Sequence, residues 1–321
     1  MGIDFQITDA AHLYGLDNMD ASATLVAANA AIIGSVLTEV DSWGTGGLPV
    51  GSVGIVTVTL SGGFTEKIGL SNLDGTNYVL DTMQFFRTAT GELLMGANGS
   101  VNFTIANIGT ALQIQNIFSG NDIIYGNSYD NVLRGGYAAN DQIDGGGGQN
   151  TVIFSGLSSQ YQITKSGSAM SVTGPAGTDT LVNIQTLQFD DQSIAYNVNG
   201  NAGTAAKIIG AVFGPSVVSN AQYEGIGIRA LAAGMSEGKL MQVAIDAALG
   251  ANATNSTDVV NLLYTNVVGT APDPASLVYY KGMLDTGAIS VASLGVLAAE
   301  TSINAAHINL VGLATTGIHY T

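Results

Sequence analysis

A glycine- and aspartate-rich stretch from Gly120 to Ile153 repeats a unit of nine residues. Full copies run from Gly126 to Arg134, from Gly135 to Asp144 with one inserted residue, and from Gly145 to Ile153. A truncated copy, Gly120 to Tyr125, comes before them. Because six residues of such a unit form a turn and three form a short strand, successive copies are expected to wind into a flattened parallel β-roll with two copies per coil.

Each place in the unit has its own role. Glycines at the first, second and fourth places allow positive φ and bring carbonyl oxygens inward, and an acid at the sixth place supplies a carboxylate. The apolar residues at the eighth place fill the core, and they are Ile124, Leu133, Ile143 and Val152. Calcium takes about six to eight oxygen ligands from carboxylates and backbone carbonyls, which stacked turns present. The spacing therefore predicts bound calcium (Ca²⁺).

Alternate copies stack on the same side of such a coil. Asp122 and Asp141 share one side, where we expect a strong calcium site. Asn131 and Asn150 occupy the sixth place on the other side, and their neutral amides predict weaker binding unless Asp130 or backbone oxygens compensate. The expected ligands are Asp122, Asp141, Asn131, Asn150, Asp130, Asp190 and the glycines that begin the copies, Gly120, Gly126, Gly135 and Gly145. A glycine-rich loop that binds no ion is the alternative.

The repeated unit resembles the hemolysin-type (RTX) calcium-binding repeat family. The stretch from Tyr161 to Asp191 resembles the β-segment that closes such rolls in secreted bacterial proteins. In it, Asp179, Asp190 and Asp191 are either extra ligands or solvated turn residues. Members of this family typically leave Gram-negative cells through a one-step (type I) channel with an uncleaved C-terminal signal. The resemblance thus implies a secreted or cell-surface protein whose roll folds in the high calcium outside the cell.

The composition agrees with a cation-binding, exported chain. The 321 residues include 24 acids against 8 Lys and Arg, a formal net charge of −16. This acidity argues against nucleic acid and anionic lipid as partners and favours divalent cations. There is no cysteine, and we see no classical signal peptide. The apolar stretch from Ala21 to Leu37 is too short and too rich in alanine for a transmembrane segment and predicts a buried helix.

The pattern of residues 1–118 predicts an α+β domain that is mainly β and that resembles no recognised family. We expect a helix from Ala21 to Val40 and a hinge with Gly and Pro from Gly44 to Gly51. Apolar runs predict strands at Val53 to Leu60, Tyr78 to Arg87, Glu92 to Met95, Val101 to Ile105 and Leu112 to Ile117. The Asn98-Gly99 pair between two of these runs predicts a hairpin turn.

Residues 201–321 predict an all-α domain with an internal repeat. Leu231 and Gly234 recur as Leu284 and Gly287, a shift of 53 (284 − 231). The stretch from Leu263 to Tyr280 resembles DUF4214, a bacterial helical domain of unassigned function that often accompanies surface-layer and RTX proteins. This chain departs from the family's usual Arg, Gly and Trp, with Thr270, Ser276 or Ala275, and Tyr280 in their places. Asp273 is expected to cap a helix.

No motif of an enzyme is found. There is no His-Glu-x-x-His and no Gly-x-Ser-x-Gly, and the histidines His12, His307 and His319 lie far apart. We therefore expect a non-enzymatic, multidomain α+β protein with an N-terminal α+β domain (1–118), a calcium-binding β-roll with a β cap (119–200) and a helical domain (201–321).

The leading hypothesis is a secreted structural protein, a surface-layer or extracellular-matrix subunit that self-assembles into a lattice or filament, with cell-surface polysaccharide as a further partner. An adhesin or ligand-capture module, in which residues 1–118 bind sugar, haem or a host protein, is the first alternative. A hydrolase of unfamiliar type within those residues is the second.

Overall fold

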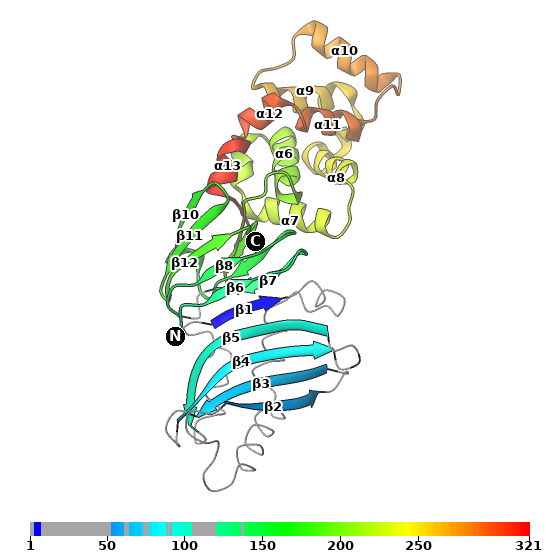
Figure 1. Cartoon of the computed structure of the whole chain (residues 1–321). Coiled ribbons are helices and arrows are strands. Elements are labelled where there is room, and N and C mark those ends of the chain that lie inside the picture. Colours follow the sequence, from blue (N-terminus) through cyan, green and yellow to red (C-terminus); the bar gives the residue numbers. More distant parts are fainter. Residues whose placement is uncertain are drawn as a thin grey trace. The chain divides into compact units, whose positions relative to one another are not determined.

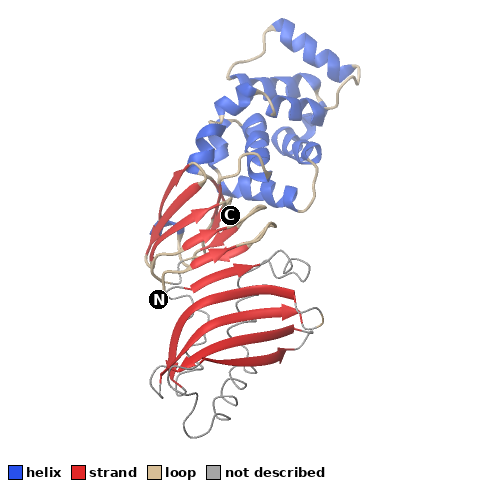
Figure 2. Cartoon of the chain, in the orientation of Figure 1, coloured by secondary structure: helices blue, strands red, loops and turns tan. Residues whose placement is uncertain are grey.

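The computed structural model describes residues 3–7, 53–60, 64–72, 77–87, 89, 92–104, 120–135 and 138–321 (Figure 1). The chain forms two compact units, residues 1–190 and 191–321. In the described parts, strands make up most of the first unit and helices most of the second (Figure 2), so the expected order of a β part followed by a helical part is confirmed. The expected helix Ala21 to Val40, the hinge Gly44 to Gly51 and the strand Leu112 to Ile117 lie outside the described residues.

Five strands, antiparallel to one another, form one end of a mixed ten-stranded sheet in unit 1, and β6 of the repeat region (Ile123–Tyr125) continues this sheet parallel to the first of them. The five strands are β1 (Ile3–Ile7), β2 (Val53–Leu60), β3 (Phe64–Asn72), β4 (Asn77–Arg87) and β5 (Glu92–Thr104). They lie in the order β1-β5-β4-β3-β2, and β2 matches the bounds expected from its apolar run. The strands β1 and β3 were not among those expected, because neither carries a long apolar run.

The expected hairpin at Asn98-Gly99 is wrong. Both residues lie inside β5, which is one continuous strand. Opposite them, Leu80 pairs with Val101 and Thr82 with Asn98, so β5 has one residue more than β4 over this stretch. An extra residue of this kind is a β-bulge, which glycine accommodates as readily as a turn.

Short parallel strands follow in the repeat region. They are β6 (Ile123–Tyr125), β7 (Val132–Arg134), β8 (Gln142–Asp144), β9 (Thr151–Ile153), β12 (Gly177–Val182) and β13 (Thr186–Gln188). Strand β8 pairs with both β6 and β12, whereas β9 pairs with both β7 and β13. Ile124 faces Ile143, and Leu133 faces Val152. Alternate copies therefore lie in the same sheet, as two copies per coil require.

The eighth-place residues form the core of these coils, as expected. Ile124, Leu133, Ile143 and Val152 are all at most 1% exposed. In the segment that closes the coils, β10 (Gln162–Ser166) and β11 (Ala169–Gly174) extend the sheet antiparallel from β12. The fully buried Phe154 ring packs against Tyr161 and Phe189, with centroids 5.3 and 5.7 Å away.

Unit 2 is a bundle of short helices with a pair of short antiparallel strands. The helices are α6 (Asn201–Phe213), α7 (Ala221–Ala232), α8 (Glu237–Leu249), α9 (Ser256–Val268), α10 (Pro274–Asp285), α11 (Val291–Ala299), α12 (Ser302–His307) and α13 (Leu310–Thr316). The strand β14 (Ser193–Ala195), before the helices, pairs with β15 (Ile318–Tyr320), after them. No helix in the described part of the chain combines the length and the apolar character needed to cross a bilayer.

The helices of unit 2 recur at a spacing close to that of the expected internal repeat. Both bounds of α7 recur in α10 at a shift of 53 (274 − 221), and those of α6 recur in α9 at a shift of 55 (256 − 201). The glycines that follow α7 and α10, Gly234 and Gly287, both have positive φ. Each donates its N–H to the leucine carbonyl three residues earlier, which ends the helix in the same way in both copies.

The two copies pack together at equivalent positions. The Asn266 amide donates to the carbonyls of Ala211 and Val212 at 3.3 and 2.7 Å, and Ala211 is its counterpart in α6 (266 − 55). Likewise, a Cβ at Gly295 of α11 would lie 2.6 Å from the side chain of Met241 in α8, the counterpart at a shift of 54. Contact between equivalent residues is the mark of a two-fold arrangement, so the repeats face each other instead of stacking in tandem.

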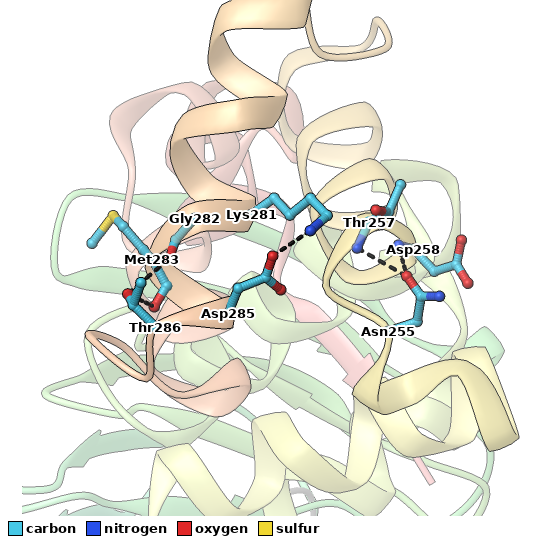
Figure 3. A network of polar contacts seen from close by, with 8 residues as sticks. All are labelled: Asn255, Thr257, Asp258, Lys281, Gly282, Met283, Asp285 and Thr286. Carbon is cyan, nitrogen blue, oxygen red and sulfur yellow. Dashed lines mark hydrogen bonds and ion pairs between the residues drawn. The ribbon is translucent and has the colours of Figure 1, made fainter.

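Polar caps end these helices where the sequence places them. Asp273 accepts hydrogen bonds from the N–H groups of Ala275 and Ser276, both at 2.9 Å, and so caps α10 as expected. Figure 3 shows the equivalent role of Asn255 at the start of α9, where it accepts from two N–H groups. The same view shows the ion pair between Lys281 and Asp285, one turn apart on α10.

Candidate functional site

The sixth-place acids form a buried column along one side of the coils. Asp122 and Asp141 are 1% and 2% exposed, and Asp179 of β12 continues the column at 3%. The main-chain N–H of Asp122 donates to Asp141 Oδ1, and that of Asp141 donates to Asp179 Oδ1, both at 2.9 Å. Each carboxylate thus reaches back to the preceding coil. The expected grouping of Asp122 with Asp141 on one side is confirmed.

Sequence reasoning missed Asp179 as the third member of this column. A recognisable signal was present, because Asp179-Thr180-Leu181 has the same spacing from acid to apolar residue as Asp141-Gln142-Ile143. The match was hidden by the long insertion of β10 and β11 between the coils.

The carboxylates of this column repel one another when they are ionised. The pKa of Asp141 is raised to about 7, chiefly by burial; the hydrogen bond from the Asp122 N–H acts to lower it, and the charges of Asp179 and Asp122 act to raise it. A cation beside the column would remove this penalty, because a positive charge favours the ionised form of each acid. Carboxylate oxygens are also the ligands that calcium prefers, so this side of the coils fits the expected ion.

Amides take the place of these acids on the other side. Asn131 and Asn150 are 1% and 0% exposed, and the N–H of Asn131 donates to Asn150 Oδ1 at 2.9 Å. The N–H of Asn150 in turn donates to Gln185 Oε1 at 2.6 Å. Gln185 therefore closes the amide column as Asp179 closes the acidic one, and the sequence pattern did not reveal it.

A second set of hydrogen bonds joins neighbouring coils at the rim, through fifth-place side chains. Asn121 Oδ1 accepts from the N–H of Asn140, and Asp130 Oδ1 accepts from the N–H of Gln149, at 3.0 and 2.7 Å. Asp130, expected to compensate for the missing carboxylates, lies exposed at this rim with that contact. Asp190 accepts from the N–H of Gly156 at 2.9 Å in the closing segment.

The glycines of the repeat act in two ways. Gly146 and Gly148, at the second and fourth places, have positive φ as expected. The first-place glycines instead allow close approach: a Cβ at Gly126 would lie 2.4 Å from the Gly145 carbonyl oxygen, and a Cβ at Gly145 would lie 2.4 Å from Asn150 Nδ2. The side chains of the column pack directly on these Cα atoms. A Cβ at Gly135 would lie 2.8 Å from the Phe154 ring, and Gly120 occupies the fourth place of the truncated copy.

In the part of the chain that the structure describes, the aspartate column included, titratable side chains alone do not make a complete metal site. Within the described ranges, no three acidic or histidine side chains are grouped so that they could hold a metal ion, so a cation in the coils would draw on backbone carbonyls as well. His307 Nδ1 lies 3.0 Å from the Val267 carbonyl, and His319 Nδ1 lies 3.1 Å from Gln192 Oε1. Burial lowers the pKa of His319.

Two apolar grooves occupy equivalent places in the two helical repeats. One, of about 250 Å³, is lined by residues that include Leu263, Leu294 and Leu297. The other, of about 220 Å³, is lined by their counterparts Ile208, Leu240 and Val243. The outer residues Leu297 and Val243 are 60% and 49% exposed, so each groove presents apolar surface at its mouth.

Comparisons with known proteins do not assign this chain to a family. No protein family matches the chain, and no curated protein matches it either. Among solved structures, the extracellular lipase LipA from Serratia marcescens is similar over 22% of this chain and 13% of the lipase, at 21% identity and a TM-score of 0.16. The chain thus spans a small part of that enzyme's length, and a likeness of this extent carries no argument about fold or activity.

Proposed function

We propose that the chain is a secreted, calcium-binding structural protein that self-assembles at the cell surface of a Gram-negative bacterium, as a subunit of a surface layer, matrix or filament. The observation that carries the calcium part is the column of Asp122, Asp141 and Asp179, three carboxylates almost wholly removed from water. Ionised acids at such positions are costly without a compensating positive charge. Calcium would supply that charge, and the turn carbonyls would complete its ligands.

Self-assembly is supported by the character of the surface. Large apolar side chains are exposed on the helical unit, among them Val278 at 72%, Tyr279 at 64% and Val311 at 86%. Exposed apolar side chains of this size are typical of surfaces that contact another protein. The net charge of −16 would oppose close packing of subunits, and bound calcium would reduce it.

Electron microscopy of the purified chain, with calcium and after chelation, tests the proposal. Ordered sheets or filaments that form only with calcium are the expected result. Single particles under both conditions would contradict self-assembly, whereas assemblies that persist in chelator would contradict its dependence on calcium. Isothermal titration with calcium on the same sample separates binding from assembly.

A ligand-capture module is the second candidate, and the duplicated apolar grooves favour it. Two equivalent binding places in one unit suit a ligand with apolar groups, such as haem or an apolar peptide. Haem titration and a glycan array on the full chain test this candidate. Saturable haem binding that is halved in Leu297→Asp and in Val243→Asp, and lost when the two are combined, would support it. The exposed substitution Lys239→Asp is the control.

A further inference from the structure

The amide side of the coils differs from the acidic side because its buried side chains are neutral and need no cation to balance them. We propose that Asn150 stands in place of a bound cation, so that its side of the coils is held without metal and calcium binds on the aspartate side alone. The inference rests on the proposed function, because it takes the aspartate side as the calcium-binding one. The sequence predicted a second, weaker calcium site on the amide side, whereas this inference predicts that no calcium binds there.

The hydrogen bonds fix which way the Asn150 amide points. One of its terminal atoms receives the N–H of Asn131 at 2.9 Å, and only oxygen can accept there. The other faces two main-chain carbonyls, Gly147 O at 2.7 Å and Asn183 O at 2.9 Å, and only nitrogen can donate to both. Both N–H donors and one of the two acceptor positions of this side chain are therefore used, in a residue that is 0% exposed.

The nitrogen lies where an ion would have to lie. Gly147 belongs to the same turn as Asn150, and Asn183 to the turn of the next coil, so the two carbonyls converge from neighbouring turns. Calcium binds carbonyl oxygen at about 2.3–2.6 Å, and Nδ2 donates to these two oxygens at the comparable distances of 2.7 and 2.9 Å. Because Nδ2 also packs against the Cα of Gly145, the amide and a cation exclude each other.

A carboxylate at position 150 would reverse this arrangement. Asn150→Asp keeps the shape and the oxygen that accepts from Asn131, but it sets a second oxygen against the two carbonyls. Two repulsive oxygen contacts and a buried charge would then replace two hydrogen bonds. A calcium ion between the new carboxylate and the carbonyls would restore attraction. The variant should therefore lose stability without calcium and gain an ion with it.

Calcium titration of four full-length chains tests the proposal: the parent, Asn150→Asp, Gln162→Glu and the double variant Asp122→Asn with Asp141→Asn. Gln162→Glu is the matched control, since it adds the same charge on an exposed residue of β10. We expect Asn150→Asp to bind one calcium ion more than the parent, and the control to bind the same number. In chelator, the unfolding equilibrium constant of Asn150→Asp should rise roughly a hundredfold, and calcium should reverse the change.

The outcomes separate the two proposals. The inference is overturned if Asn150→Asp and the parent bind equal numbers of ions with equal stability in chelator, or if millimolar calcium fails to refold the variant. It is also overturned if the double aspartate variant keeps a calcium ion that Asn150→Ala then removes. If the parent binds no calcium but Asn150→Asp does, the proposed function fails on the aspartate side while the assignment of Asn150 stands.

Discussion

A buried glutamate in the helical unit allows a quantitative prediction about pH. Glu224 on α7 is 0% exposed, and neither carboxyl oxygen has a hydrogen-bond partner among the described residues. Ile228, one turn further along the helix, packs against the apolar cluster of Ile209, Val218 and Ile318, so Glu224 lies on the face turned towards that cluster. In the second repeat its counterpart is Leu277 (224 + 53). The fold therefore tolerates an apolar residue here.

The direction of the effect follows from proton binding. Burial raises the pKa of Glu224 from its ordinary value of 4.5 to about 8. Between these two values the folded chain holds a proton that the unfolded chain releases, so the stability of the unit falls as pH rises and levels off above about 8. Integrated from about pH 5.5 to about pH 9, the loss is on the order of 3 kcal/mol.

Glu224→Leu should abolish this loss. We expect the variant to be at least as stable as the parent near pH 5.5. Its advantage in unfolding free energy should be roughly 3 kcal/mol larger near pH 9 than near pH 5.5. The change is measured by urea unfolding followed by helical circular dichroism, to which the helices α6 to α13 of this unit contribute. Asp246→Asn, which neutralises an exposed acid on α8, is the control. Parallel pH profiles for Glu224→Leu and the parent would refute the reasoning.

Other substitutions probe the packing and the ion site. Asn266→Ala removes two hydrogen bonds to carbonyls of α6 and should destabilise the helical unit by roughly 1–3 kcal/mol in urea unfolding; an unchanged midpoint would refute the role of this contact between repeats. Phe154→Ala should cost roughly 3–5 kcal/mol and speed proteolysis of the closing segment, and a resistant variant would contradict this. Asp122→Asn combined with Asp141→Asn should abolish the effect of calcium on circular dichroism, whereas Asn131→Ala should do less. Equal folding of both in millimolar calcium would contradict the assignment of sides.

The spacing of the repeat was enough to predict which residues share a side and which fill the core. Ile143 and Val152 had to be buried, because a nine-residue unit with three strand residues brings the eighth place inward in every copy. The same spacing could not show what the sixth-place side chains bind. That depends on the rotamer, which directs Asp141 Oδ1 to the N–H of Asp122 and leaves no trace in the sequence.

Non-local pairing limited the prediction elsewhere. Asp179 and Gln185 complete columns that begin 57 and 54 residues earlier (179 − 122 and 185 − 131). The short Asp179-Thr180-Leu181 match does not by itself show which coil it continues, and Gln185 has no such match. Asn98-Gly99 is compatible with both a turn and a bulge, and the partners of β5 on either side decide between them. Glu224 is equally hidden, since a glutamate in the first turn of a helix is most often a solvated residue that favours the helix dipole.

The mixed columns have a consequence for calcium affinity. If amides hold one side without metal, the coil is partly formed before any ion binds, and less conformational entropy is lost on binding. A coil with aspartate on both sides would begin unfolded and would have to order both sets of turns with ions. Asn131→Asp combined with Asn150→Asp should therefore bind more calcium yet need a higher calcium concentration to reach the midpoint of folding. A lower midpoint, measured by circular dichroism during calcium titration, would show that the amide side does not preorganise the coil.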